Sequence, residues 1–253
     1  MIKLENINFY YEDIKALDDL SLTINSGEKI VLLGNNGCGK STLLKLLAGL
    51  IYPKSGEYIY KDKKITKKYL KQNSRDFRKD FAILFQNPDA MLFNPTVKDE
   101  IAFSLDEFEV SSSVQNIAEQ FNISHLLDKS PLKLSGGEKQ KVALAAIFAV
   151  EPKVLLLDEP TANLDPRSTG WLVDFLQELN ITVVISTHNL SLAYELGTRA
   201  IVLDETHKII YDGDLDTLYK DEDLLYRANL IHKHKHTHDG VEHSHFHIHN
   251  WSK

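Results

Sequence analysis

The chain has 253 residues, which is enough for one large domain or for one domain that carries a smaller insert. Apolar residues make up 43% and charged residues 26% of it, a balance typical of a globular protein with a full core. The net charge is −7 with histidine neutral, and no basic stripe follows the chain, so a general affinity for nucleic acid is not expected. The single cysteine, Cys38, excludes an internal disulfide and fits a reducing compartment.

Nothing in the hydropathy pattern predicts a membrane span. The first residues, Met1 to Glu12, mix charges with β-forming residues and lack the apolar core of a signal peptide. The longest apolar run, from Val142 to Val150, is far shorter than the ~20 residues that cross a bilayer. We therefore expect that any role at a membrane depends on a partner.

Patterning and turn signals divide the chain into three segments and a tail. The segment before about residue 85 predicts strands at 2–10, 20–24, 29–33 and 57–60 and a helix at 40–50. The middle segment, about 88–151, predicts helices at 99–105, 114–121 and 136–150. The last segment predicts strands at 154–158, 182–186, 199–203 and 208–211, with helices at 166–179 and 190–196. This alternation implies an α/β protein with a mainly parallel sheet and an inserted helical subdomain.

The composition changes after about residue 230. Eight of the eleven histidines lie between His232 and His249. Such bias predicts a disordered tail, residues 231–253, that follows a folded domain over residues 1–230.

The segment from Gly34 to Thr42 fits the phosphate-binding pattern G-x-x-x-x-G-K-[ST]. Its glycines let successive N–H groups turn inward at a helix N-terminus, where the helix dipole favours a negative charge. Lys40 is expected to reach the β- and γ-phosphates, and the Ser41 hydroxyl to bind Mg²⁺. The predicted contacts to nucleotide are Gly34, Asn35, Asn36, Gly37, Cys38, Gly39, Lys40, Ser41 and Thr42.

The apolar strand predicted at 154–158 ends in two acids, Asp158 and Glu159. If this strand lies beside the phosphate-loop strand, Asp158 comes near Mg²⁺, and Glu159 faces the γ-phosphate and polarises the attacking water. A core strand that ends in solvated acids is the alternative, and the phosphate loop earlier in the chain weighs against it.

Between these motifs lies Leu134-Ser135-Gly136-Gly137-Glu138. Ser135 is a good helix N-cap, and the two glycines let a phosphate approach the positive end of the helix. With its flanking motifs, this pentapeptide resembles the nucleotide-binding subunits of ATP-binding cassette (ABC) transporters, and the match covers about residues 1–215. The resemblance implies a P-loop NTPase of ABC ATPase type, with an antiparallel β part beside the parallel core and a helical subdomain at about 88–151. It also implies a dimer in which Ser135, Gly136, Gly137 and Glu138 of one subunit meet the γ-phosphate held by the other.

The same resemblance assigns further site residues. Tyr11 matches the aromatic residue that stacks on adenine, although Tyr10 is a nearby rival. Gln86 matches the hinge glutamine that reaches Mg²⁺ and the water. The loop 162–165 matches the one that crosses the dimer interface, and His188 matches the histidine that contacts the γ-phosphate. The implied catalytic residues are Glu159, His188 and Gln86, and the implied Mg²⁺ ligands are Ser41, Gln86 and Asp158.

The stretch from Phe85 to Phe93, followed by Pro95-Thr96-Val97, resembles the energy-coupling-factor branch of this family. Those importers pair two ATPases with a transmembrane coupling protein and a substrate-binding membrane protein. The resemblance implies that the surface after Gln86 receives helices of the coupling protein, with Met91, Leu92 and Phe93 as apolar anchors. Ordinary packing within the subdomain stays open as the alternative.

In the tail, histidine alternates with other residues, so an extended chain brings the rings to one side. Neutral imidazole suits Ni²⁺, Co²⁺, Zn²⁺ and Cu²⁺. Similar tails occur in ATPases of nickel and cobalt importers of the same branch; a solvated linker and zinc binding unrelated to transport stay open. The candidate Ni²⁺ or Co²⁺ ligands are His232, His234, His236, His238, His243, His245, His247 and His249.

The sequence thus predicts an ATP- and Mg²⁺-dependent ATPase at the cytoplasmic face of the cell membrane. We expect it to pair with a second ATPase subunit, most simply a copy of itself, and to drive an importer of nickel or cobalt ions. The alternatives are a vitamin importer of the same branch, a soluble ABC ATPase of translation or DNA repair, and a metal-storage protein.

Overall fold

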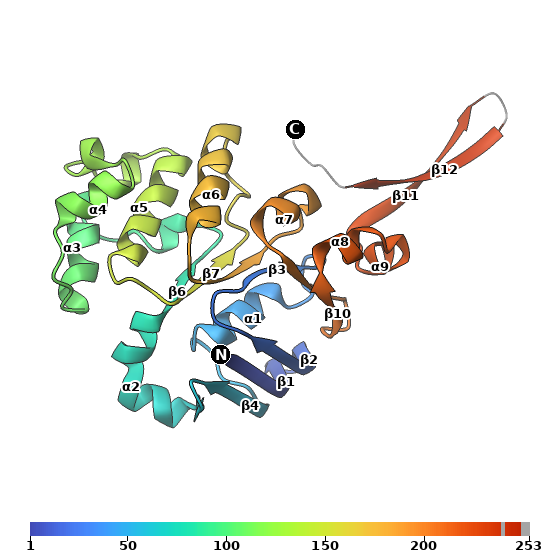
Figure 1. The fold of residues 1–253 in the computed structure, drawn as a ribbon, viewed down its shortest axis with the longest axis horizontal. Coiled ribbons are helices and arrows are strands. Elements are labelled where there is room, and N and C mark those ends of the chain that lie inside the picture. The colour runs from blue at the N-terminus through green and yellow to red at the C-terminus, as the bar shows by residue number, and fades with distance from the viewer. Residues whose placement is uncertain (239–240, 249–253) are drawn as a thin grey trace. The chain divides into compact units, whose positions relative to one another are not determined.

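A computed structural model describes residues 1–238 and 241–248 (Figure 1). The chain forms two compact units. Unit 1 comprises Met1–Thr66 and Val184–Lys253, and unit 2 comprises Lys67–Val183. Among the described residues, no helix is both long and apolar enough to cross a membrane.

Unit 1 contains an antiparallel four-stranded sheet in the order β2-β1-β4-β5. Its strands are β1 (Ile2–Tyr11), β2 (Ile14–Ile24), β4 (Ser55–Tyr60) and β5 (Lys63–Lys64). Buried residues alternate with half-buried ones at the start of β1, the period expected of a strand with one face on the core. This sheet is the antiparallel part that the sequence predicts.

The second part of unit 1 supports the phosphate loop. Strand β3 (Lys29–Leu33) pairs in parallel with β9 (Arg199–Leu203), which pairs antiparallel with β10 (Ile209–Asp214). The helices of this part are α1 (Lys40–Leu47), α7 (Leu190–Leu196), α8 (Leu215–Tyr219) and α9 (Glu222–Arg227). Strand β3 is buried from Ile30 to Leu33, as a strand of a covered parallel sheet should be.

Unit 2 is mainly helical. Strands β6 (Phe81–Leu84) and β7 (Val154–Asp158) pair in parallel, and β8 (Thr182–Ser186) crosses the boundary between the units. The helices are α2 (Lys67–Asp80), α3 (Val97–Glu107), α4 (Val114–Gln120), α5 (Gly136–Phe148) and α6 (Pro166–Glu178). Short 3₁₀ turns lie at η1 (Pro88–Ala90), η2 (Ser124–Leu126) and η3 (Pro131–Lys133). Helices α3, α4 and α5 form the green part of Figure 1.

Local sequence explains where the unit 2 helices begin. Side chains of Thr96, Ser113, Ser135 and Asp165 cap α3, α4, α5 and α6 by accepting backbone N–H groups. An aromatic cluster then joins the end of α4 to α5 and α6: Phe175 of α6 lies 5.1 Å from Phe148 of α5 and 5.3 Å from Phe121 at the C-cap of α4, centroid to centroid.

The fold class agrees with the prediction, and several elements differ from it. The helix predicted at 40–50 ends at Leu47, because Gly49 takes a left-handed φ of 67°. Helix α2 is not predicted by the sequence; it is strongly polar, and only Leu70 and Phe77 are buried. The proposed limits of the helical subdomain, 88–151, stay a prediction within unit 2.

The composition predicts a disordered tail, whereas the structure describes two strands there. Strands β11 (Ile231–His238) and β12 (Val241–Ile248) pair antiparallel. Histidine alternates with other residues there, and a period of two is also the side-chain period of a β-strand. Residue His249 lies outside the described residues.

Candidate nucleotide-binding site

The predicted phosphate loop lies between β3 and α1 in unit 1. Gly39 stands at the N-cap of α1 with φ 114°, and no described side chain caps this end of the helix. A Cβ atom on Gly39 would lie 2.4 Å from the Ala16 carbonyl oxygen, and one on Gly34 would lie 2.4 Å from that of Leu203. Both positions therefore require glycine, and the backbone is held close to its neighbours as in an anion-binding loop.

Lys40 lies inside the loop. Its side chain is 6% exposed, and its ammonium donates to the carbonyl oxygens of Gly34 at 2.7 Å and Asn35 at 3.1 Å. The charge is thus held over the turn where phosphate oxygens are expected. Ser41 is exposed and Thr42 is buried. Cys38 is buried as well, and this burial raises the pKa of its thiol.

Strand β8 brings His188 to the same unit as the loop. The Thr187 N–H donates to the Leu32 carbonyl of β3 at 3.1 Å, which fixes the position of the neighbouring His188 backbone. His188 is exposed, and Asn189 caps α7 directly after it. The geometry is compatible with the predicted contact to a γ-phosphate, and that contact stays a prediction.

The two candidate adenine contacts differ in their surroundings. Tyr11 is 43% exposed and packs edge-on against Phe9, with ring centroids 4.9 Å apart. The ring of Tyr10 lies 5.8 Å from the ammonium of Lys15. Tyr11 therefore offers the more open aromatic surface, and its contact with adenine stays a prediction.

The predicted carboxylates lie in unit 2, where β7 ends. Asp158 and Glu159 are each 8% exposed, although both are acidic. Glu159 adopts a left-handed φ of 45°, a conformation that costs energy for a residue with a Cβ. Strain of this kind is concentrated at functional sites, so it supports a role for Glu159 beyond packing.

The pentapeptide around Ser135 forms a capping box at the start of α5. The Ser135 N–H and hydroxyl donate to the Glu138 carboxylate at 2.8 and 2.7 Å, and the Glu138 N–H donates to the Ser135 hydroxyl at 3.4 Å. The hydrogen bonds from Ser135 lower the pKa of Glu138. A Cβ atom on Gly137 would lie 2.2 Å from the Ser168 hydroxyl oxygen, so a larger residue here would force the Ser168 side chain to move.

Several residues of unit 2 that were predicted as site residues line one cavity of about 210 Å³. Gln86, Gly136 and Asn163 line it, together with Gln140 and Lys139, which the sequence does not single out. The Gln140 amide donates to the Pro160 carbonyl at 3.2 Å, directly after Glu159. Gln140 lies one helical turn after Gly136, a spacing from which its place on the same face could be inferred.

The donor set predicted for Mg²⁺ has the chemistry that this ion prefers. Ser41, Gln86 and Asp158 offer a hydroxyl, an amide and a carboxylate oxygen, and Mg²⁺ sites of this kind are completed by phosphate and water. Among the side chains that the structure describes, no three His, Cys, Asp or Glu residues gather into a metal site.

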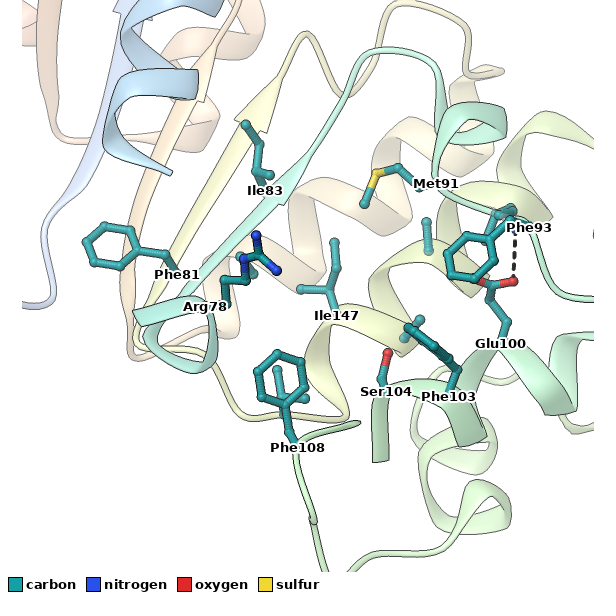
Figure 2. Close-up of a pocket in the computed structure, with 15 residues that line it drawn as sticks. Arg78, Phe81, Ile83, Met91, Phe93, Glu100, Phe103, Ser104, Phe108 and Ile147 are labelled. Carbon is teal, nitrogen blue, oxygen red and sulfur yellow. Dashed lines mark hydrogen bonds between the residues drawn. The ribbon is translucent and has the colours of Figure 1, made fainter. Parts of the chain in front are cut away.

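Unit 2 also carries an apolar cavity of about 310 Å³, shown in Figure 2. Met91 and Phe93, predicted as anchors for a partner, line it with Leu92. Phe93 is 68% exposed and meets Phe103 of α3 edge-on, with centroids 5.2 Å apart. The buried Glu100 carboxylate accepts the N–H groups of Phe93 at 3.1 Å and Asn94 at 2.8 Å, so it fixes the segment that presents these anchors.

Comparison with known proteins defines the class. The family model described as "ABC transporter" matches residues 17–162, and the chain belongs to this family. The chain is therefore an ATP-binding, ATP-hydrolysing cassette.

Named relatives are more particular. The chain is 40% identical over 241 residues to the nickel import ATP-binding protein LarO of Lactiplantibacillus plantarum, covering 91% of this chain and 99% of LarO. It is 39% identical over 232 residues to the energy-coupling factor transporter ATP-binding protein EcfA of Methanoculleus marisnigri, covering 88% of this chain and 82% of EcfA.

Solved structures of ABC transporter proteins agree with the membership of this chain in that family. CbiO1 of Clostridium perfringens, described as part of the ABC transporter complex cbiONQ, is 34% identical with a TM-score of 0.74, covering 90% of this chain and 94% of cbiO1. The dimeric ABC transporter cassette MJ0796 is 26% identical with a TM-score of 0.73, covering 85% of this chain and 99% of MJ0796.

Proposed function

We propose that this cassette drives an importer of the energy-coupling-factor branch and that the cargo is nickel or cobalt. The observation that carries the proposal is the segment after Gln86, which resembles that branch and presents Met91 and Phe93 at an apolar cavity. The similarity to LarO and EcfA supports the same branch. It does not by itself select a cargo, because one relative is named for nickel and the other for no ion.

In the proposed mechanism, each ATP is held by the phosphate loop of one subunit and the Ser135 segment of another. Two features support this: the Ser135 cap leaves α5 with its positive end at the glycines, and the similar cassette MJ0796 is dimeric. Glu159 orients the attacking water, while Lys40 and His188 stabilise charge on the γ-phosphate. Mg²⁺, held by Ser41, Gln86 and Asp158, would neutralise phosphate charge when bound.

The cavity of Figure 2 is the proposed docking place for a transmembrane partner. Its lining is mostly apolar, and two of its aromatic residues are exposed, Phe93 by 68% and Phe103 by 47%. An amphipathic helix that inserts apolar residues into such a groove would remove these rings from water. This partner would hold the cassette at the cytoplasmic face of the membrane.

The C-terminal hairpin is proposed to bind Ni²⁺ or Co²⁺ close to the transporter. Its register pairs His232 with His247, His234 with His245 and His236 with His243. Imidazole is a suitable ligand for both ions, and opposite residues of a hairpin are neighbours. The alternatives are a tail without a role in transport, zinc binding, and a vitamin cargo.

Uptake measurements in cells that lack the native protein test the proposal. Cells with the full chain should accumulate ⁶³Ni or ⁵⁷Co, and cells with Glu159→Gln should not. A chain truncated after Leu230 tests the tail separately from the ATPase domain: lower metal uptake with intact ATPase activity would support a transport role for the hairpin. Uptake of a vitamin instead of either ion would overturn the cargo, and ATPase activity without any membrane partner would favour a soluble ABC ATPase.

A further inference from the structure

The phosphate loop contacts the turn that joins β9 to β10, which lies outside the motifs described above. The turn comprises residues 204–208. At one end, the Leu203 carbonyl approaches Gly34 so closely that a Cβ atom there would lie 2.4 Å away. At the other end, Nδ1 of His207 lies 3.2 Å from the Cys38 carbonyl oxygen. The last residue of β9 therefore lies against the first glycine of the loop, and the turn that follows contacts the residue before the last glycine.

We propose that His207 is a positioning residue for the phosphate loop. A carbonyl oxygen can only accept a hydrogen bond, so Nδ1 of His207 carries the proton and donates. In a trans peptide, the C=O and the next N–H lie in the peptide plane and point in opposite directions. By holding the Cys38 carbonyl outward, His207 turns the Gly39 N–H toward the side where a phosphate loop receives its anion.

The turn is braced, so that it can hold the loop in one place. The Asp204 carboxylate accepts the N–H groups of Thr206 at 3.0 Å and Lys208 at 3.3 Å. The His207 carbonyl accepts the N–H of Asp18 on β2 at 3.0 Å. On a further side, the Asn229 amide donates to the Glu205 carboxylate at 2.6 Å. His207 itself has a left-handed φ of 64°, which is unusual for a residue with a Cβ and is maintained by these contacts.

Substitutions at His207 can separate the donor from the rest of the side chain. Asparagine has its Nδ2 the same number of bonds from Cα as Nδ1 of histidine, and it tolerates a left-handed φ. His207→Asn therefore keeps a donor near the Cys38 carbonyl. His207→Gly removes the donor and relieves the backbone, so it should not destabilise the fold. His207→Asp places an acceptor where the donor stood.

The experiment measures the Kd of ATP and of ADP for the full chain, together with kcat and KM. His207→Gly should weaken both nucleotides about 2- to 10-fold, the effect of one lost hydrogen bond, and raise KM by the same factor with kcat nearly unchanged. His207→Asp should weaken them at least as much, and His207→Asn should bind within about twofold of the native chain. The midpoint of thermal unfolding without nucleotide should not fall in His207→Gly.

The matched control is Lys208→Ala. Lys208 belongs to the same turn and pairs with Asp18 at 3.4 Å, and it should not affect nucleotide affinity. Native affinity in His207→Gly would overturn the proposal. So would an equal loss in His207→Asn, which would assign the effect to the ring, or in Lys208→Ala, which would assign it to the stability of the turn.

Discussion

Glu159 offers the sharpest test of the site, because its charge and its backbone strain can be changed separately. Glu159→Gln keeps the shape and the left-handed φ of 45° and removes only the charge. If Glu159 orients the attacking water, kcat should fall by about 10²- to 10⁴-fold while ATP binding is retained, so the variant should accumulate as an ATP-bound dimer. Steady-state hydrolysis and size-exclusion chromatography with ATP measure the two effects, and normal turnover would refute the assignment.

The strain at Glu159 predicts an effect on stability with a definite sign. Glu159→Ala and Glu159→Gly both remove the carboxylate, and only glycine relieves the left-handed backbone. That conformation costs a residue with a Cβ about 1–2 kcal/mol, and glycine loses roughly 0.5–1 kcal/mol more conformational entropy on folding. At the middle of these two ranges, Glu159→Gly should therefore be more stable than Glu159→Ala by about 0.75 kcal/mol, which corresponds to roughly 1.5–3 °C in Tm. An alanine variant that is equally stable or more stable would show that the backbone at this position is not strained.

Three further outcomes are expected. Gly39→Ala should abolish ATP binding and lower the free energy of unfolding by roughly 2–4 kcal/mol, because its Cβ would lie 2.4 Å from a carbonyl oxygen. The control Gly170→Ala, in open space on α6, should leave the free energy of unfolding unchanged or raise it. Equal effects of the two substitutions in calorimetry would contradict this. Hydrogen bonds from Ser135 hold the pKa of Glu138 below its usual 4.5. The stability that the Glu138 carboxylate contributes is therefore present above pH 4.5 and is lost as the pH falls through the lowered pKa. In acid denaturation, Glu138→Gln should lose less stability than the native chain. Lys139 pairs with Asp89 at 2.6 Å with side chains 17% and 50% exposed, so a double-mutant cycle in urea should give a coupling of about 0.2–1 kcal/mol, and no coupling would show that the pair does not join α5 to η1.

Short-range signals in the sequence were sufficient for most of the fold. The strand, loop and helix around Lys40 follow from local periodicity and glycine positions, and the caps at Ser135 and Asp165 follow from side chains that bond their own helix. Helix α2 could not be predicted in this way, because the segment is strongly polar and only Leu70 and Phe77, seven positions apart, mark its buried face.

The contacts that the sequence could not supply are the long-range ones. His207 and Cys38 are 169 positions apart, and nothing in the local pattern of either residue indicates the other. The left-handed φ of Glu159 is likewise set by the surrounding structure, since glutamate has no local preference for it. These are positions at which tertiary structure imposes a conformation, and such positions are often functional.

Within unit 2, the apolar cavity and the start of α5 at Ser135 are connected by a short path of contacts. Met91 lines the cavity, and two positions before it Asp89 forms the ion pair with Lys139 of α5. Lys139 lies one turn after Ser135, the cap of that helix, and it lines the smaller cavity together with Gln86. A partner that shifts the segment 86–93 would therefore move Gln86 through the chain itself and would move α5 through the ion pair between Asp89 and Lys139. Under the proposed function, this arrangement would offer a route by which a docked membrane partner and ATP influence each other without direct contact.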